Sequence, residues 1–180
     1  MNDSPNYAEY TVEQKPEGKY LVRRILMIVF YVAFSGVWLG VLVGVLKLWP
    51  FGALWPVLLA IIVFFTWRFV AMEHEYVIQS GMITFTEVFG HRTRKKAFEY
   101  KIRDMKKIAP TTDEYAAEYA DASVTGDFRG SVKSPDSYFF TYGDEGGKKC
   151  VVFFEATNKA IKVMRFYNGQ GTVMSTTLRY

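Results

Sequence analysis

The stretch "EYVIQSGMITFTEVFG", residues 75–90, repeats its apolar side chains with a period of two. Such alternation is typical of strands that bury one face, and the pair Ser80-Gly81 in its middle favours a tight turn. The stretch therefore predicts a β-hairpin that lies against a core. The side chains expected on its inner face are Tyr76, Ile78, Ile83, Phe85 and Phe89.

Toward the C-terminus, the chain continues as a small β domain. A third strand carries Phe98, Tyr100 and Ile102 inward, a short helix follows from Thr111 or Thr112, and residues 123–128 form a further strand. Residues 138–156 predict another hairpin, and a helix capped by Thr157 or Asn158 ends at Gly169. We expect a mostly antiparallel domain over residues 73–169, closed by this helix, and a C-terminal tail over residues 170–180.

Toward the N-terminus, two long apolar runs precede the hairpin. Residues 25–46 contain no charge, and as a helix they reach roughly 33 Å, enough to cross the hydrocarbon core of a bilayer. Residues 54–72 carry only Arg68, near their end. A buried hairpin in a soluble protein is disfavoured because neither run has a polar face. We expect a transmembrane hairpin over residues 21–72, with helices at about 22–47 and 54–72.

Basic residues flank the two runs and orient them. They are Lys15, Lys19, Arg23 and Arg24 before the first run, Lys47 alone between the runs, and Arg68, Arg92, Arg94, Lys95 and Lys96 at or after the second. This asymmetry predicts a multi-pass protein of the cell membrane with both termini in the cytoplasm. The single cysteine, Cys150, fits a reducing compartment and is expected in the core. Residues 1–20 are polar and are expected to form a flexible cytoplasmic tail.

Residues 75–108 resemble the opening of the bacterial pleckstrin-homology-like (PH-like) domains of small membrane proteins, and the order of elements resembles an uncharacterised bacterial family of two-helix membrane proteins. The positions that carry the resemblance are Tyr76, Gly81, Ile83, Gly90, Arg92, Arg94, Ile102 and Ile108. The resemblance implies a strongly bent sheet capped by the last helix, and it implies no catalytic residues. The acidic insertion from Asp113 to Asp121 departs from the simplest form of the pattern.

Gly36, Gly40 and Gly44 recur every four residues in the first apolar run. On a helix this spacing makes a face without side chains, which another helix can approach closely. Either the stripe has no specific partner, or it has one of two. The face packs against the protein's own second helix, near Ala53 and Ala60, or against another membrane protein, including a second copy of the chain.

The charges are arranged in blocks: residues 91–107 are basic, 108–145 acidic and 146–180 basic. The run "GHRTRKK", residues 90–96, is expected at the tip of a turn close to the membrane. The first hypothesis is that the basic blocks meet anionic lipid headgroups, and the second that the acidic block neutralises them within the domain. The candidate binding residues are Arg92, Arg94, Lys95, Lys96, Lys159 and Lys162.

No pattern of catalytic or cofactor-binding residues is recognisable. "GDEGGKK" lacks the spacing of a phosphate-binding loop, and His74 and His91 lack the neighbours of a zinc site. A metal or proton site at His74 with Glu73 and Glu75 is the remaining enzyme hypothesis. A balancing acidic block argues against nucleic acid as a partner. We therefore expect no enzyme and no cofactor, but a membrane-bound binding or scaffolding module, or else a subunit of a membrane complex assembled through the glycine face.

Overall fold

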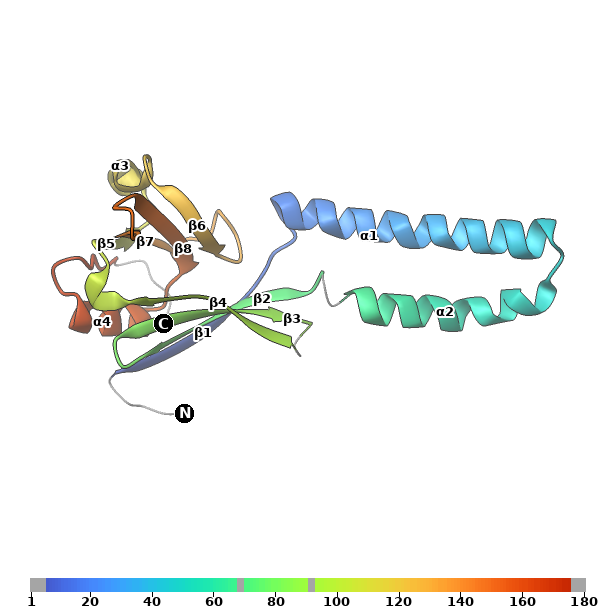
Figure 1. Ribbon diagram of the computed structural model, residues 1–180, viewed down its shortest axis with the longest axis horizontal. Helices are drawn as coiled ribbons and strands as arrows, with labels where there is room; N and C mark the ends of the chain where they lie inside the picture. Colours follow the sequence, from blue (N-terminus) through green and yellow to red (C-terminus); the bar gives the residue numbers. More distant parts are fainter. Residues whose placement is uncertain (1–5, 68–69, 91–92, 176–180) are drawn as a thin grey trace. The chain divides into compact units, whose positions relative to one another are not determined.

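The computed structural model describes residues 6–67, 70–90 and 93–175 and divides into two compact units. One unit holds the two long helices, and the other holds two four-stranded sheets and the last helix (Figure 1). The fold is thus α+β, with two apolar helices, sheets rich in antiparallel pairs and a C-terminal helix, as expected.

The helical unit is a hairpin. Helix α1, Gly18–Val37, passes directly into a π-helical stretch, Trp38–Val45, and helix α2 spans Trp49–Trp67. Both helices begin about four or five residues before their expected starts. The connection is shorter than expected because Lys47 adopts a left-handed backbone conformation, with φ of 57°, and reverses the chain at once.

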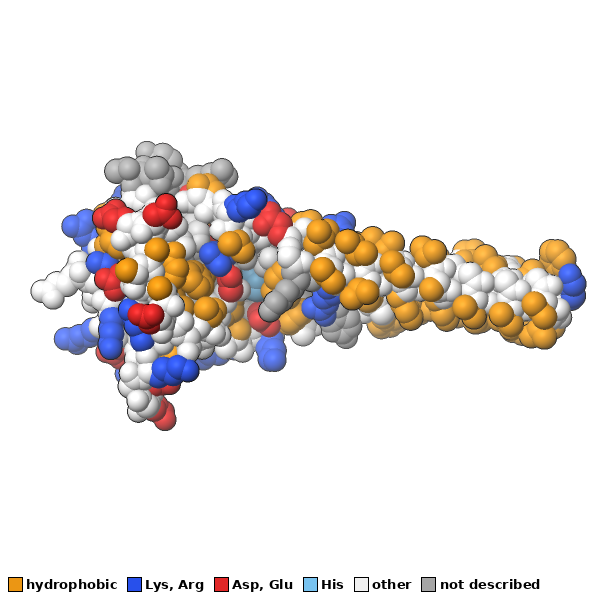
Figure 2. Space-filling model, turned by 90° about the horizontal axis from the view of Figure 1, so that it is seen from above, with side chains coloured by type: hydrophobic (Ala, Val, Ile, Leu, Met, Phe, Trp, Pro, Cys, Tyr) orange, Lys and Arg blue, Asp and Glu red, His pale blue; other side chains and the backbone are white. Residues whose placement is uncertain are grey.

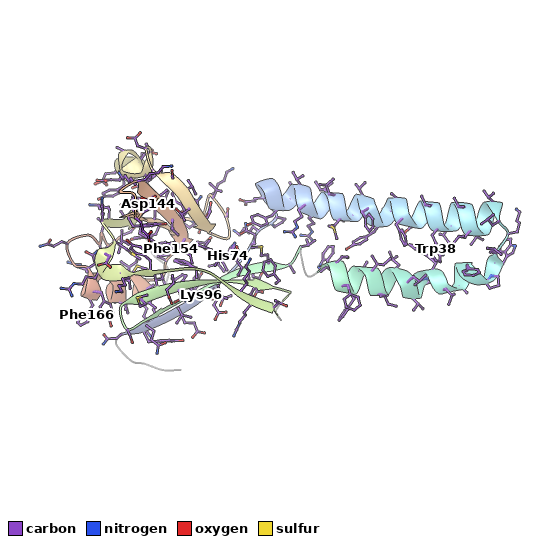
Figure 3. The ribbon with its side chains drawn as sticks, in the orientation of Figure 1. Trp38, His74, Lys96, Asp144, Phe154 and Phe166 are labelled. Atoms are coloured by element: carbon purple, nitrogen blue, oxygen red, sulfur yellow. The ribbon has the colours of Figure 1, made fainter. Side chains whose placement is uncertain are left out.

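Aromatic side chains hold the two helices together. The rings of Phe34 and Trp55 are 5.4 Å apart, and those of Trp38 and Trp55 are 6.1 Å apart. Trp38 lies between the helices (Figure 3) and donates from Nε1 to the carbonyl of Phe51 at 3.2 Å. Tyr31 and Thr66 share a hydrogen bond of 2.5 Å between their hydroxyls. The contact is therefore made by large side chains.

The first sheet has the order β1-β2-β3-β4. Its strands are β1 (Tyr7–Glu13), β2 (Met72–Gln79), β3 (Met82–Phe89) and β4 (Thr93–Lys101). Strand β1 pairs antiparallel with β2, from Tyr7 opposite Gln79 to Glu13 opposite Glu73. The expected flexible tail is therefore wrong for residues 7–13, because their alternation buries Ala8 and Val12 against the core. Along the chain, the helical hairpin therefore lies between two strands, β1 and β2, that pair with each other.

The second sheet has the order β5-β7-β8-β6. Its strands are β5 (Lys107–Pro110), β6 (Ser123–Phe128), β7 (Ser137–Gly143) and β8 (Lys149–Glu155). The β7–β8 hairpin is antiparallel, as expected from residues 138–156, whereas β6 pairs parallel with β8. Thr172 forms a bridge with Ile108, so the described part of the expected C-terminal tail, residues 170–175, begins as a segment beside β5.

Short helical elements link and close the sheets. A 3₁₀ turn at Ile102–Asp104 follows β4, and a second at Asp113–Tyr115 leads into α3, Ala116–Tyr119. Helix α4, Asn158–Tyr167, is capped by the Thr157 side chain, which accepts from the backbone N–H of Ala160 at 3.2 Å.

One continuous core joins both sheets and α4. It includes Tyr76, Ile78, Ile83 and Phe85 from the first sheet, Phe140, Val152 and Phe154 from the second, and Ile161 and Met164 from α4. Phe154 lies in this interior (Figure 3). Cys150 is also buried, as expected. On β3, the third buried side chain is that of Val88 and not the expected Phe89.

Candidate functional site

The basic run lies in a strand and not at a turn tip. Strand β4 begins at Thr93, so Arg94, Lys95 and Lys96 are strand residues, while Arg92 lies outside the residues that the structure describes. All three described side chains are exposed, because β4 is the edge of its sheet and its first half extends beyond the core. The expectation of a charged turn tip is therefore wrong for these three residues.

One end of the first sheet is where the chain passes into the two long helices and returns from them. We call it the hairpin end, and the basic stretch of β4 begins there. The strands β1 and β3 end there, and β2 and β4 begin there. The backbone N–H of Gly90, after β3, donates to the carbonyl of Ala71 at 2.9 Å. The opposite end, called the turn end, carries Gly81, whose carbonyl accepts from Ile102 at 2.9 Å. The chain leaving α2 is thus tied to the connection that precedes β4.

Two of the basic side chains are paired with acids of their own sheet. Arg94 Nε lies 3.3 Å from Glu75 Oε2, and Lys96 Nζ lies 2.8 Å from Glu99 Oε2. The hydrogen bond from Lys96, followed by one from Thr84, lowers the pKa of Glu99. The Lys96–Glu99 pair is exposed and contributes little to stability, whereas in the other pair only Arg94 is exposed and the Glu75 side chain is 14% exposed. Both bases remain accessible to other partners. Within the described residues, Lys95 has no ion pair.

The acidic block, residues 108–145, belongs to the second sheet and not to the sheet that carries the basic stretch of β4. Tyr119 packs its ring 4.7 Å from Phe139 and 5.4 Å from Phe153, on the outer face of the second sheet. Glu118 lies 3.9 Å from Lys149, and Asp127 binds Arg129. Part of the block forms strands of the second sheet, and the segment with Tyr119 covers the outer face of that sheet. Among the described residues, Glu118 and Asp127 of this block pair with bases other than Arg94, Lys95 and Lys96.

The structure does not bring the basic residues of α4 together with those of β4. Lys159 and Lys162 are exposed on α4, which packs against β1, the opposite edge of the first sheet. The last residue of α4, Tyr167, lies against Gly81 at the turn end. Figure 3 shows Phe166, on the turn of α4 after Lys162, well apart from Lys96. The six candidate residues are therefore not one cluster.

The glycine face of the first helix is open. A Cβ placed on Gly36 or Gly40 would have no neighbour within 4 Å among the described residues, and one on Gly44 would meet only the Leu39 carbonyl, at 3.8 Å. The interpretation that this face packs against α2 is therefore wrong. The bulky rings of Phe34, Trp38 and Trp55 occupy the contact between the helices and turn the glycines away from it.

His74 belongs to a buried polar network that the sequence did not predict. Its Nε2 is 2.9 Å from Gln14 Oε1, Gln14 Nε2 donates to the Gly130 carbonyl at 3.3 Å, and Glu155 Oε1 accepts from the N–H of Gly130 at 2.9 Å. Burial lowers the pKa of His74, which the charge of Asp127 opposes. Of the residues in this network, only Glu155 could have been suspected from the sequence, because it is an acid that directly follows five apolar residues of β8.

The hypothesis of a site formed by His74 with Glu73 and Glu75 finds no geometric support. Strand alternation turns His74 inward, onto the ring of Phe128, and both glutamates to the other face of β2. His74 lies at the start of this strand in Figure 3. Among the described residues, no group of three or more His, Cys, Asp or Glu side chains could hold a metal ion.

Comparison with known protein families places most of the chain in a described family. The model of a family described as "Bacterial PH-like domain (DUF6106)" matches residues 2–174. No curated protein matches the chain, and no solved structure does. The matched range of this chain includes β1, the helical hairpin and both sheets.

Proposed function

Because the chain belongs to the bacterial PH-like domain family (DUF6106), we propose that it is a membrane-anchored binding module, not an enzyme, whose Arg94, Lys95 and Lys96 contact anionic lipid headgroups. Arg92 would belong to the same basic stretch by its position in the sequence. In this proposal the helical hairpin crosses the membrane of the cell, and both termini lie in the cytoplasm.

The surface of the hairpin supports insertion. Tyr20–Val45 and Trp49–Trp67 are long and apolar enough to cross a membrane, and in their most apolar windows 0% and 6% of residues are buried within the structure. Figure 2 shows hydrophobic side chains along the visible face of this unit, whereas Lys, Arg, Asp and Glu cover much of the sheet-bearing unit. An exposed apolar surface of this extent is unstable in water and stable in a bilayer.

The hydrogen bond from Gly90 to Ala71 is the single observation that carries the lipid proposal. Both residues belong to the helical unit, and Gly90 precedes Arg94 by four residues, so the basic start of β4 is close along the chain to the proposed bilayer. A Lys or Arg near an anionic leaflet is attracted by about 1 kcal/mol. Phosphate groups can replace Glu75 and Glu99 as partners of Arg94 and Lys96.

The test uses the full chain in lipid nanodiscs that contain spin-labelled phosphatidylglycerol or phosphatidylcholine. We expect the wild type to restrict the anionic lipid preferentially. The triple substitution Arg94→Gln, Lys95→Gln, Lys96→Gln should reduce this preference by about fivefold or more, and added salt should reduce it as well.

The matched control is Lys101→Gln, Arg103→Gln, Lys106→Gln, which removes the same charge from exposed residues at the turn end of the same strand and just beyond it. This variant should retain the preference. An unchanged preference in the first variant, or an equal loss in both, would contradict the proposal.

The open glycine face favours a second candidate function, that of a subunit in a membrane complex or a homo-oligomer. Gly36 and Gly40 leave room for a helix of another chain at close distance. Crosslinking in native membranes tests this candidate. Gly40→Leu should abolish a crosslinked species that Val57→Leu, at a 58% exposed position of α2 and not on the glycine face, leaves intact; identical patterns in both variants would exclude it.

A further inference from the structure

The loop between β6 and β7, residues 129–136, is held rigidly at its base by a buried carboxylate. Glu155 is only 8% exposed, and its Oε1 accepts from the N–H groups of Gly130 and Ser131 at 2.9 Å and 3.2 Å. Hydrogen bonds between a carboxylate and backbone N–H groups are among the stronger ones in proteins. The loop therefore has a fixed path where it leaves the second sheet.

The same loop is pressed against the last residues of β1. A Cβ on Gly130 would lie 2.5 Å from the Glu13 carbonyl oxygen and 2.5 Å from Val12 Cγ1, so no side chain fits there. The Gln14 amide donates to the Gly130 carbonyl at 3.3 Å. Since Lys15 begins the helical unit, the loop is attached at the hairpin end of the domain, next to the residue after which the chain enters that unit.

The apex of the loop presents an apolar side chain to the outside. Val132 is 68% exposed, and Lys133 and Pro135 are exposed as well. Local bonds keep this apex in shape: Lys133 N–H donates to the Ser131 hydroxyl at 3.2 Å, and Ser134 N–H to the Ser131 carbonyl at 3.2 Å. An exposed valine side chain is not stabilised by contact with water. At the boundary between headgroups and acyl chains, the valine can be buried among the chains while the neighbouring lysine stays at the level of the phosphates.

We infer that this loop is a second lipid-contacting element, in which Val132 enters the headgroup layer of the bilayer that holds the hairpin and Lys133 binds lipid phosphate. The inference rests on the proposed function, because it requires that the hairpin be embedded. It adds a contact from the second sheet to the contact of β4 from the first. The partner is the lipid surface itself, since the loop is attached where the chain enters the helices.

The experiment places a single environment-sensitive fluorophore on the full chain in nanodiscs without a quencher, or with a nitroxide carried either near the headgroup end of the acyl chains, where Val132 is expected, or near their middle, where Val32 is expected. Three cysteine variants are compared. Val132→Cys reports on the loop, and Val32→Cys, on the 67% exposed face of α1, reports on insertion of the hairpin. Val124→Cys is the matched control, because Val124 is 63% exposed near the start of β6, at the far end of the second sheet from Glu155.

We expect several-fold stronger quenching at Val132 than at Val124, together with strong quenching at Val32. The native Cys150 is buried, and labelling of the wild type measures its background. Quenching at Val32 but not at Val132, or equal quenching at Val132 and Val124, would overturn the inference and leave the anchored module intact. Absence of quenching at Val32 would overturn the membrane proposal and the inference together.

Discussion

Gly130 is the residue at which one added carbon would meet both a neighbouring backbone and a buried side chain. The added atom would lie 2.5 Å from the Glu13 carbonyl, which cannot move without disturbing the β1–β2 pairing. We expect Gly130→Ala to lower the free energy of unfolding by about 1–3 kcal/mol, as overpacked sites do. Thermal unfolding in detergent measures this as a fall in Tm of about 2–4 °C for each kcal/mol.

Gly143→Ala is the control for this substitution. Its added carbon would touch only the end of the flexible Lys106 side chain, at 3.7 Å. A loss of stability as large in Gly143→Ala would mean that the close approach of the loop to β1 is not the cause.

His74 is expected to make the stability of the domain depend on pH. Burial lowers the pKa of the folded imidazole below its ordinary value of 6.5, so below that pH the unfolded chain binds a proton that the folded chain resists. The stabilisation is complete above pH 6.5 and is lost as the pH falls through this value toward the lower pKa of the folded state. His74→Gln removes the titration and keeps an amide near Gln14.

We therefore expect the Tm of the wild type to fall more than that of His74→Gln between about pH 7.5 and pH 5.5, a window above most carboxylate titrations. Parallel decreases in the two proteins would show that His74 does not titrate on unfolding.

The inward side chains of single strands could be predicted from the sequence, because alternation depends only on neighbours along the chain. Tyr76, Ile78 and Phe85 are buried as expected. The partners of the charged residues could not be predicted, because they depend on which strands become adjacent. Arg94 meets Glu75 two strands away in the sheet order, not the acidic block.

At the level of elements, the caps of two helices make a clear comparison. Thr157 accepts a hydrogen bond at the start of α4, whereas Thr112 precedes a 3₁₀ turn without a side-chain cap. Thr157→Ala should therefore cost about 1 kcal/mol and Thr112→Ala much less. Chemical denaturation of both variants measures the difference. Equal losses would show that the cap of α4 contributes nothing beyond helix propensity.

The helices and the C-terminal hairpin could be predicted because their signals are local and strong. Strand β1 was missed for the opposite reason: "YAEYTVE" is short, buries only Ala8 and Val12 and pairs with residues beyond the whole helical hairpin. The basic start of β4 was placed in a turn because both of its faces are exposed, which removes the alternation that marks a strand.

At the level of the whole molecule, the pairing of β1 with β2 decides which fragments can fold. A fragment of residues 73–180 lacks β1 and would expose the side of β2 that β1 covers. We expect this fragment to aggregate or remain unfolded. A derivative in which a short Asn-Gly turn replaces residues 15–71 keeps both strands in register, and we expect it to be soluble and to unfold cooperatively. Circular dichroism compares the two, and a fragment as stable as the derivative would show that β1 is dispensable.

Under the proposed membrane insertion, the helical hairpin also couples its own insertion to folding of the first sheet during synthesis. Strand β1 leaves the ribosome first and must wait for β2, which follows after about 60 residues, several seconds at roughly 5–20 residues per second. In a bilayer, the two strands can meet only if the stretch between them crosses an even number of times. A chain with only one of the two helices inserted would leave β1 and β2 on opposite faces of the bilayer. The first sheet therefore cannot form in a molecule with only one helix inserted, and the unfolded domain of such a molecule would be open to proteolysis.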